Sequence, residues 1–147
     1  MTQLPSRPDG VAVAEGRLVA WIPGRLKNPL NGSQGVSRAG RIWRTTERRE
    51  WRSRTMLVVR DAMNRSRWRY SPLHGAVVVL TAYVWNRFDE DGLAAALKPV
   101  VDGLVDATLI DGDGPSSGHR FERRQEINRR HRGVEVVVEP RFEEAPR

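Results

Sequence analysis

The stretch Ala76-Val-Val-Val-Leu-Thr-Ala-Tyr-Val-Trp85 decides how the rest of this chain is arranged. Its β-branched and aromatic residues make it the strongest strand signal in the sequence. Because both alternating faces are apolar, we expect a central strand that is covered on both sides of its sheet. The strand leads into Phe88-Asp89-Glu90-Asp91. Acidic side chains are therefore predicted at its carboxyl end, where open α/β sheets place their functional sites.

Two helices are predicted around this strand. The first runs from about Thr46 to Asn64, with Glu47 and Glu50 in its first turn. Its apolar stripe consists of Trp51, Thr55, Val58, Val59 and Ala62. The second helix spans residues 92–107, with a stripe of Leu93, Leu97, Val100, Val101 and Leu104. Pro99 interrupts this helix, which either kinks there or gives way to a new helical segment that starts at Pro99.

Further strands complete the predicted fold. Residues 17–23 form the first strand, and a glycine-rich loop over residues 24–40 follows it. Residues 120–128 and 133–139 are interpreted as a hairpin with its turn at 129–133. The order β-loop-α-β-α-β-β predicts an α/β (mixed α+β) fold, with a mixed sheet of about four strands flanked by two main helices. We expect one domain over residues 1–147, with a loose arm at 1–15 and a frayed tail at 140–147.

Composition excludes several classes of site. The chain has no cysteine, which rules out disulfides and thiolate zinc sites. Its three histidines, His74, His119 and His131, lack helical metal-ligand spacing, so a magnesium or manganese site built from carboxylates is favoured over zinc. No apolar run approaches the roughly 18 residues that span a membrane. Residues 1–10 lack the apolar core of a signal peptide, and we expect a cytoplasmic protein.

The charge balance points to nucleic acid. The formal net charge is +7, and lysine occurs only at Lys27 and Lys98, so arginine supplies most of the positive charge. Arginine binds phosphate as a bidentate fork and stacks on bases. The alternative is a basic surface that is merely solvated. Trp68 either stacks on an unpaired base or covers a core edge. The candidate DNA-binding residues are Lys27, Arg38, Arg41, Arg67, Arg69, Arg123, Arg124 and Arg130.

Carboxylates gather around the second helix. If residues 88–91 stay extended, the side chains of Asp89 and Asp91 point to the same side. Asp91, Lys98 and Asp102 share one stripe of the helix, opposite the apolar one. Two like charges about 4 Å apart repel by roughly 4 kcal/mol at an effective dielectric of about 20, so such a cluster favours a divalent cation. The glycine-rich turn with Asp111 and Asp113 can bring a further carboxylate to it.

Each of these acids also has an ordinary interpretation. An aspartate before a helix is often a cap. Asp111-Gly-Asp-Gly is compatible with a common turn. Lys98 and Asp102 are spaced as a surface ion pair. Their combination after a buried strand in a basic protein favours a functional site.

These motifs carry a family resemblance. Asp89-x-Asp91-Gly-Leu, Lys98-Pro-Val-Val-Asp102-Gly-Leu and Leu109-Ile-x-Gly-Asp113-Gly-Pro together resemble the RusA family of Holliday-junction resolvases, in particular its phage-type branch. The resemblance covers about residues 17–139. It departs from the family at Gly92, where an asparagine is usual, and at Gly112-Asp113, where an Asp-Asp doublet is usual. By position Asp113 matches the second acid of the doublet, and Asp111 is kept in reserve.

The resemblance implies a homodimeric, Mg²⁺-dependent endonuclease that cuts branched DNA in recombination and repair. Asp89, Asp91 and Asp113 would hold Mg²⁺, or Mn²⁺ in its place, and Lys98 would stabilise charge on the scissile phosphate. Symmetric cutting of a junction implies two active sites and a two-fold dimer. We expect no nucleotide cofactor. The alternative is a non-catalytic nucleic-acid-binding module that keeps the resolvase fold with a degraded metal site. A nuclease that acts on other DNA or RNA structures is a third possibility.

Overall fold

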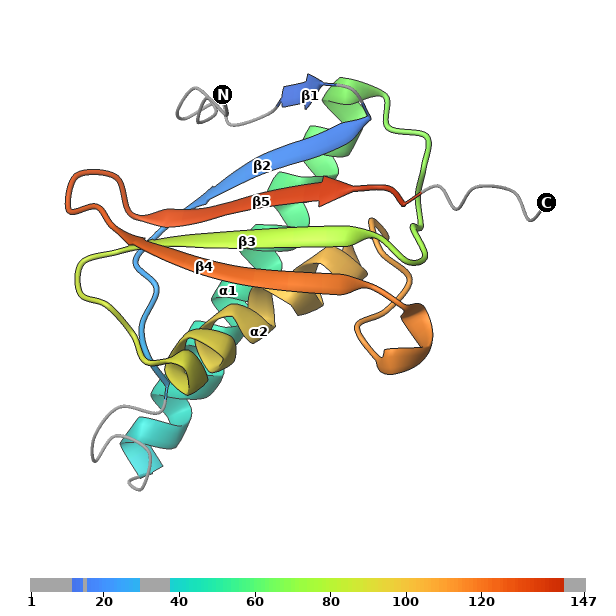
Figure 1. Ribbon diagram of the computed structural model, residues 1–147. Helices are drawn as coiled ribbons and strands as arrows, with labels where there is room; N and C mark the ends of the chain where they lie inside the picture. The colour runs from blue at the N-terminus through green and yellow to red at the C-terminus, as the bar shows by residue number, and fades with distance from the viewer. Residues whose placement is uncertain (1–11, 15, 30–37, 142–147) are drawn as a thin grey trace.

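The structure is a computed structural model that describes residues 12–14, 16–29 and 38–141. Its centre is a mixed sheet of five strands in the order β1-β2-β5-β3-β4 (Figure 1). The strands are β1 (Ala12–Ala14), β2 (Arg17–Pro23), β3 (Val77–Val84), β4 (Arg120–Ile127) and β5 (Gly133–Glu139). β3 lies between β5, which is antiparallel to it, and β4, which is parallel to it. The predicted mixed α+β fold with β3 at its centre is confirmed.

Two helices, α1 (Arg38–Ser66) and α2 (Glu90–Asp106), cover one face of this sheet. Both lie behind the strands in Figure 1, and the core forms between them and side chains such as Leu80, Leu97 and Val136. The predicted cover on both sides of β3 is provided by helices on this face. On the other face Val79 is half-buried, while Tyr83 is buried against the Trp21 ring at 5.3 Å between centroids.

The first helix is longer than its sequence predicted. α1 begins at Arg38 rather than near Thr46, so the predicted loop over residues 24–40 ends in helix, while residues 30–37 lie outside the described part. Glu47 and Glu50 consequently fall in the interior of α1 and not in its first turn. The predicted stripe is confirmed, because Trp51, Thr55, Val59 and Ala62 are buried and Val58 is half-buried. The helix ends at Ser66, close to the predicted end.

The second helix is continuous through Pro99, which settles the two alternatives for that position. Its predicted apolar stripe is buried. α2 approaches α1 closely at Gly103, where an added Cβ would lie 2.8 Å from the Arg52 carbonyl oxygen and 2.6 Å from Thr55 Cβ. Arg52 also joins the two helices by donating to both carboxylate oxygens of Asp106, at 2.5 and 2.9 Å.

Two predictions about the strands are wrong. Residues 120–127 and 133–139 are strands, but they do not pair as a hairpin, because β3 lies between them. The apolar β5 and β3 occupy the interior of the sheet, and the charged β4 takes its edge, where side chains remain solvated. Residues 12–14 of the predicted loose arm pair with β2 as strand β1. No helix in the described residues is long and apolar enough to cross a membrane.

Candidate nucleic-acid interface

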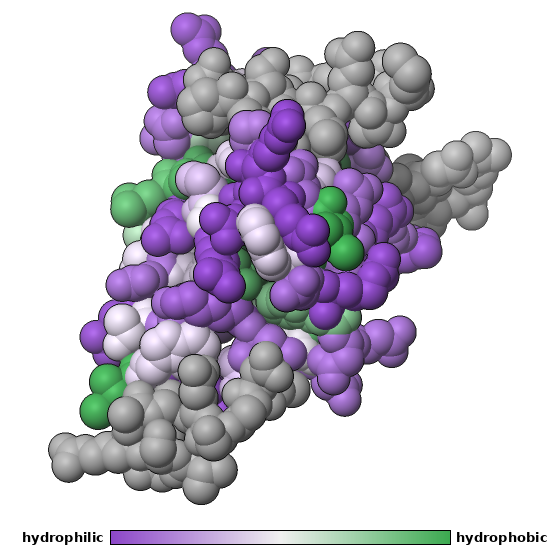
Figure 2. All heavy atoms as spheres, turned by 90° about the vertical axis from the view of Figure 1, so that its left-hand side faces the viewer, coloured by the Kyte–Doolittle hydropathy of each residue, from purple (hydrophilic) through white to green (hydrophobic). Residues whose placement is uncertain are grey.

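A cleft of about 600 Å³ opens at the C-terminal end of β3. It lies at the left-hand end of the sheet in Figure 1, and Figure 2 shows that hydrophilic side chains dominate this side of the molecule. Three segments distant in sequence line the cleft: residues 25–28 after β2, residues 83–89 from β3 to α2, and Arg132 before β5. Trp43 of α1 joins them. The β2–β5–β3 order produces this convergence, because it sets the ends of these three strands side by side.

The lining of the cleft is strongly positive. It contains Arg25, Lys27, Arg87 and Arg132, and among the described residues Asp89 is its single acidic member. Lys27 is itself partly compensated by Glu47 at 3.2 Å. A concave surface with several cations concentrates anionic ligands, and arginine is the best side chain for binding phosphate. The electrostatics of the cleft therefore suit a polyanion.

Aromatic side chains alternate with these cations. Tyr83, Trp85 and Phe88 come from β3 and the segment after it, and Trp43 faces them from α1. Trp85 is 43% exposed, and the guanidinium carbons of Arg129 and Arg132 lie 5.0 and 5.5 Å from its ring centroid. Aromatic faces beside cations provide the combination that binds unpaired bases and their phosphates.

Phe88 is held to the sheet by Gln125 of β4. The Phe88 amide donates to Gln125 Oε1, and Gln125 Nε2 donates to the Phe88 carbonyl oxygen, both at 2.8 Å. This amide clamp fixes the backbone immediately before Asp89. The carboxylate that enters the cleft is therefore carried by a segment tied to the rigid sheet.

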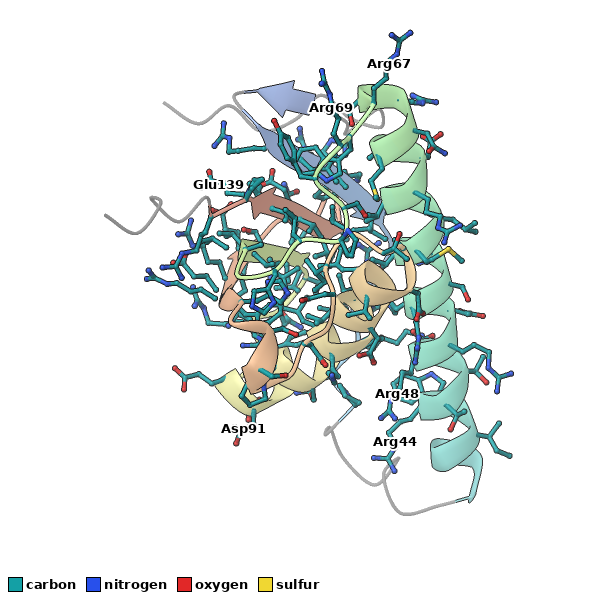
Figure 3. All side chains as sticks on the ribbon, turned by 90° about the vertical axis from the view of Figure 1, so that its right-hand side faces the viewer. Arg44, Arg48, Arg67, Arg69, Asp91 and Glu139 are labelled. Carbon is teal, nitrogen blue, oxygen red and sulfur yellow. The ribbon has the colours of Figure 1, made fainter. Side chains whose placement is uncertain are left out.

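Asp89 is the N-cap of α2, and its Oδ1 accepts a hydrogen bond from the Gly92 amide at 2.9 Å. The chain becomes helical at Glu90, so residues 88–91 are not extended as predicted and Asp91 lies on the first turn of the helix. Asp91 is exposed at the outer tip of α2 (Figure 3). Of the predicted catalytic residues Asp89, Asp91, Asp113 and Lys98, only Asp89 lines the cleft.

Gly92 leaves space that a neighbouring side chain fills. A Cβ on Gly92 would lie 2.3 Å from Asn28 Nδ2 and 2.4 Å from Asp89 Oδ1, which is too close for any side chain to be added without movement. Asn28 also lines the cleft. The amide of Asn28, from the segment after β2, thus lies where an asparagine at position 92 would place its own side chain.

Lys98 joins two acids on the polar side of α2. It donates to Asp113, and its Nζ lies 3.1 Å from Asp102 Oδ1. The hydrogen bond with Asp113 is the main cause that raises the pKa of Lys98, and the same bond lowers the pKa of Asp113. Lys98 and Asp102 thus form the surface ion pair of their ordinary interpretation, and the glycine-rich turn brings Asp113 to Lys98.

Asp111 belongs to a different cluster, with two histidines that sequence reasoning did not assign. His74 Nδ1 and His119 Nε2 each lie 2.7 Å from a separate oxygen of Asp111. The Ala76 amide donates to His119 Nδ1 at 2.8 Å, so Nδ1 carries no proton and Nε2 donates to Asp111. The hydrogen bond from His74, with a smaller contribution from His119, lowers the pKa of Asp111. This cluster links the start of β3 and β4 with the turn after α2.

The three predicted metal ligands do not meet in this arrangement. Within residues 12–14, 16–29 and 38–141, no three histidine, aspartate or glutamate side chains form a group that could hold a metal ion. Asp89 caps α2, Asp113 is paired with Lys98, and Asp91 is exposed. Mg²⁺ usually keeps several waters and binds through one or two carboxylates together with substrate phosphates. Asp89, in a cleft that suits phosphate, is the carboxylate that best fits this mode of binding.

The predicted DNA-binding residues fall into separate places. Lys27 lines the cleft, and Arg130 is exposed between the two arginines that contact Trp85. Arg67 and Arg69 lie at the opposite end of the molecule from Asp91 (Figure 3).

The remaining predicted DNA-binding residues lie on β4 and at the start of α1. Arg123 stacks over Phe121 at 5.9 Å, and Arg124 pairs with Glu122 at 2.9 Å. The side chains of Arg38 and Arg41 lie outside the described part. Trp68 packs against the core, as its ordinary interpretation predicted.

The sequence did contain a signal for the residues that were missed. Trp85 and Arg87 directly follow the central strand, so they had to lie at the same edge as Asp89. Arg25 follows β2 and Arg132 precedes β5, which places both at that edge once the strand order is known. No model of a known protein family and no curated protein matches this chain. The likeness to resolvases therefore rests on the motifs themselves.

Proposed function

We propose that this protein is a Mg²⁺-dependent, structure-selective endonuclease that acts on branched DNA, as the resemblance to RusA resolvases implies. The observation that carries the proposal is the cleft in which Asp89 lies among Arg25, Lys27, Arg87 and Arg132. A carboxylate is costly to place among phosphates unless a cation or a proton accompanies it. Its presence in a phosphate-binding cleft thus favours catalysis over simple binding.

Different residues have different roles in the proposed reaction. The cleft cations bind the DNA backbone without reading its sequence, which suits an enzyme that selects shape. Asp89 would hold Mg²⁺, which would supply an activated water and neutralise the scissile phosphate. Lys98 of α2 donates a hydrogen bond to Asp113 of the turn that follows this helix. Hydrogen bonds to Asp113 and Asp102 raise the pKa of Lys98, and the resemblance assigns this residue the role of stabilising charge on the scissile phosphate.

A dimer belongs to this proposal. Two symmetric incisions in a four-way junction require two active sites related by a two-fold axis. We therefore propose that the functional unit is a homodimer acting on branched DNA in the cytoplasm.

The test is cleavage of a synthetic four-way junction, with a linear duplex of the same sequence, in Mg²⁺ and in Mn²⁺. Asp89→Asn should reduce cleavage by at least about a hundredfold and keep or tighten junction binding, because a negative charge leaves the phosphate site. Asparagine caps helices as well as aspartate does, so the fold should persist. The matched control is Asp61→Asn on exposed α1, with cleavage equal to wild type. Failure of wild type to cut any junction, flap or bulge with either metal would overturn the proposal.

A second candidate is a non-catalytic nucleic-acid-binding module. The observation that favours it is the engagement of Asp113 by Lys98 and of Asp111 by two histidines, away from Asp89. Calorimetry with Mn²⁺ separates the candidates. The module is favoured if the protein binds no Mn²⁺, whether junction DNA is absent or present, and still binds DNA in a salt-sensitive way.

A further inference from the structure

Trp85 stands out among the aromatic residues at the cleft. It follows the last residue of β3, at an edge where the preceding Tyr83 and Val84 are buried, and yet 43% of its surface is exposed. Its indole ring contributes nothing to the core cluster. Unlike the equally exposed Tyr70, Trp85 lines the cleft, where its ring is open to a ligand. A ligand that covers the ring would account for its position.

The neighbours of Trp85 indicate what that ligand is. Arg129 and Arg132 approach its ring, and Arg25 and Arg87 lie in the same cleft. Phosphates therefore have cationic partners near an aromatic ring. Trp43 forms a second aromatic wall from α1, with Lys27 Nζ 5.4 Å from its ring centroid. A volume of about 600 Å³ is in the range of sites for small organic ligands, and a duplex does not enter such a space.

We propose that the cleft binds one unpaired nucleotide at the branch point of the DNA, with its base stacked on Trp85 and its flanking phosphates on Arg25 and Arg87. This inference rests on the proposed function for its substrate, DNA. It adds the feature by which the substrate is selected: a base that has left the helical stack. Stacking on an aromatic face is tolerant of sequence, because every base presents a π-face. The amide clamp between Gln125 and Phe88 keeps the segment that carries Trp85 in place for it.

A competing explanation gives Trp85 no contact with bases. In that case the indole only orients Arg129 and Arg132 toward the DNA backbone. Loss of the ring would then weaken binding of paired and unpaired substrates alike, because backbone contacts do not distinguish them. The two explanations therefore differ in selectivity and not only in affinity.

The experiment measures binding without divalent metal, so that no cutting occurs. The probes are a fully paired duplex and the same duplex with one bulged 2-aminopurine, whose fluorescence is quenched by stacking. Trp85→Leu should weaken binding of the bulged duplex by roughly ten- to a hundredfold and abolish quenching, while the paired duplex changes by less than about threefold. Trp85→Phe should retain most of the effect. Tyr70→Leu is the matched control, because Tyr70 is equally exposed, at 43%.

Each outcome separates this inference from the proposed function. Equal losses for both duplexes in Trp85→Leu, or no loss for either, would overturn the nucleotide site even where wild type cuts junctions. Quenching that depends on Trp85 would support the site even where no cleavage is found. Absence of all DNA binding would overturn both. Because Trp85→Phe preserves an aromatic ring, its behaviour distinguishes a loss of stacking from a loss of folding.

Discussion

At the scale of single residues, the pair Asn28 and Gly92 explains a departure from the resolvase pattern. The family usually has asparagine where this chain has Gly92. The Asn28 amide fills the space that Gly92 leaves, next to the Asp89 carboxylate. The chain thus supplies an amide to the same place from a different segment. Glycine at position 92 is a requirement of that arrangement, because an added Cβ would lie 2.3 Å from Asn28 Nδ2.

The role proposed for the Asn28 amide can be tested by moving the amide back to position 92. Gly92→Asn restores the usual family residue, but we expect it to lower junction cleavage by at least about tenfold, because its side chain must displace Asn28 or Asp89. The double variant Asn28→Gly with Gly92→Asn should recover most of the lost activity, because one amide again occupies the space. Cleavage rates of the two variants and of wild type check this. Full activity in Gly92→Asn alone would contradict the proposed exchange.

At the scale of elements, part of the resolvase-like motif serves packing. Gly103 of the Asp102-Gly-Leu run lies where α2 approaches the backbone of α1. The neighbouring Arg52–Asp106 pair joins the same two helices, and its hydrogen bonds lower the pKa of Asp106. A glycine inside a helix costs about 1 kcal/mol relative to alanine, so its presence there calls for such a contact.

Gly103→Ala should therefore destabilise the protein by about 1–3 kcal/mol, through overpacking against an α1 backbone that cannot move aside. Helix propensity alone predicts the opposite sign, a gain of about 1 kcal/mol. Gly114→Ala is the control, because nothing lies within 4 Å of its added Cβ. Chemical denaturation measures both changes. Stabilisation by Gly103→Ala would show that the helices can separate at this point.

Element types were more predictable than their pairing. Periodicity located β3, both helices and the last two strands, because apolar spacing reflects which face is buried. It could not show that β4 and β5 are separated by β3, since two adjacent strands in sequence are compatible with either arrangement. The polar side chains of β4 suit an edge in both cases. The start of α1 was missed because Arg38, Gly40 and Arg41 carry no apolar period.

At the scale of the whole molecule, the positive charge is spread over surfaces with different environments. The cleft cations Arg25 and Arg87 converge on one concave site, whereas Arg67 and Arg69 lie at the far end from Asp91 (Figure 3). Sequence analysis could count these arginines but not group them, because grouping depends on strand order. For the same reason it did not separate Asp111, with its histidines, from Asp89 in the cleft.

Salt dependence distinguishes these surfaces. The logarithm of the DNA association constant falls linearly with the logarithm of salt concentration, with a slope set by the number of phosphate contacts. Arg87→Gln should reduce the slope by about 1, and Arg67→Gln, at the opposite end, should leave it unchanged. Titrations of a labelled junction across a range of NaCl concentrations measure both. An effect of Arg67→Gln equal to that of Arg87→Gln would place the DNA on a different surface.

The position of β5 has a consequence for biosynthesis. β2 and β3 never touch as strands, and β5 alone bridges them by pairing with both. A nascent chain that ends before Gly133 therefore holds two separate half-sheets, each with an open edge that can join a neighbouring polypeptide. Closure of the sheet waits until residues near Glu139 have left the ribosome. Assembly of the complete sheet consequently depends on β5, which is made after both of the strands that it joins.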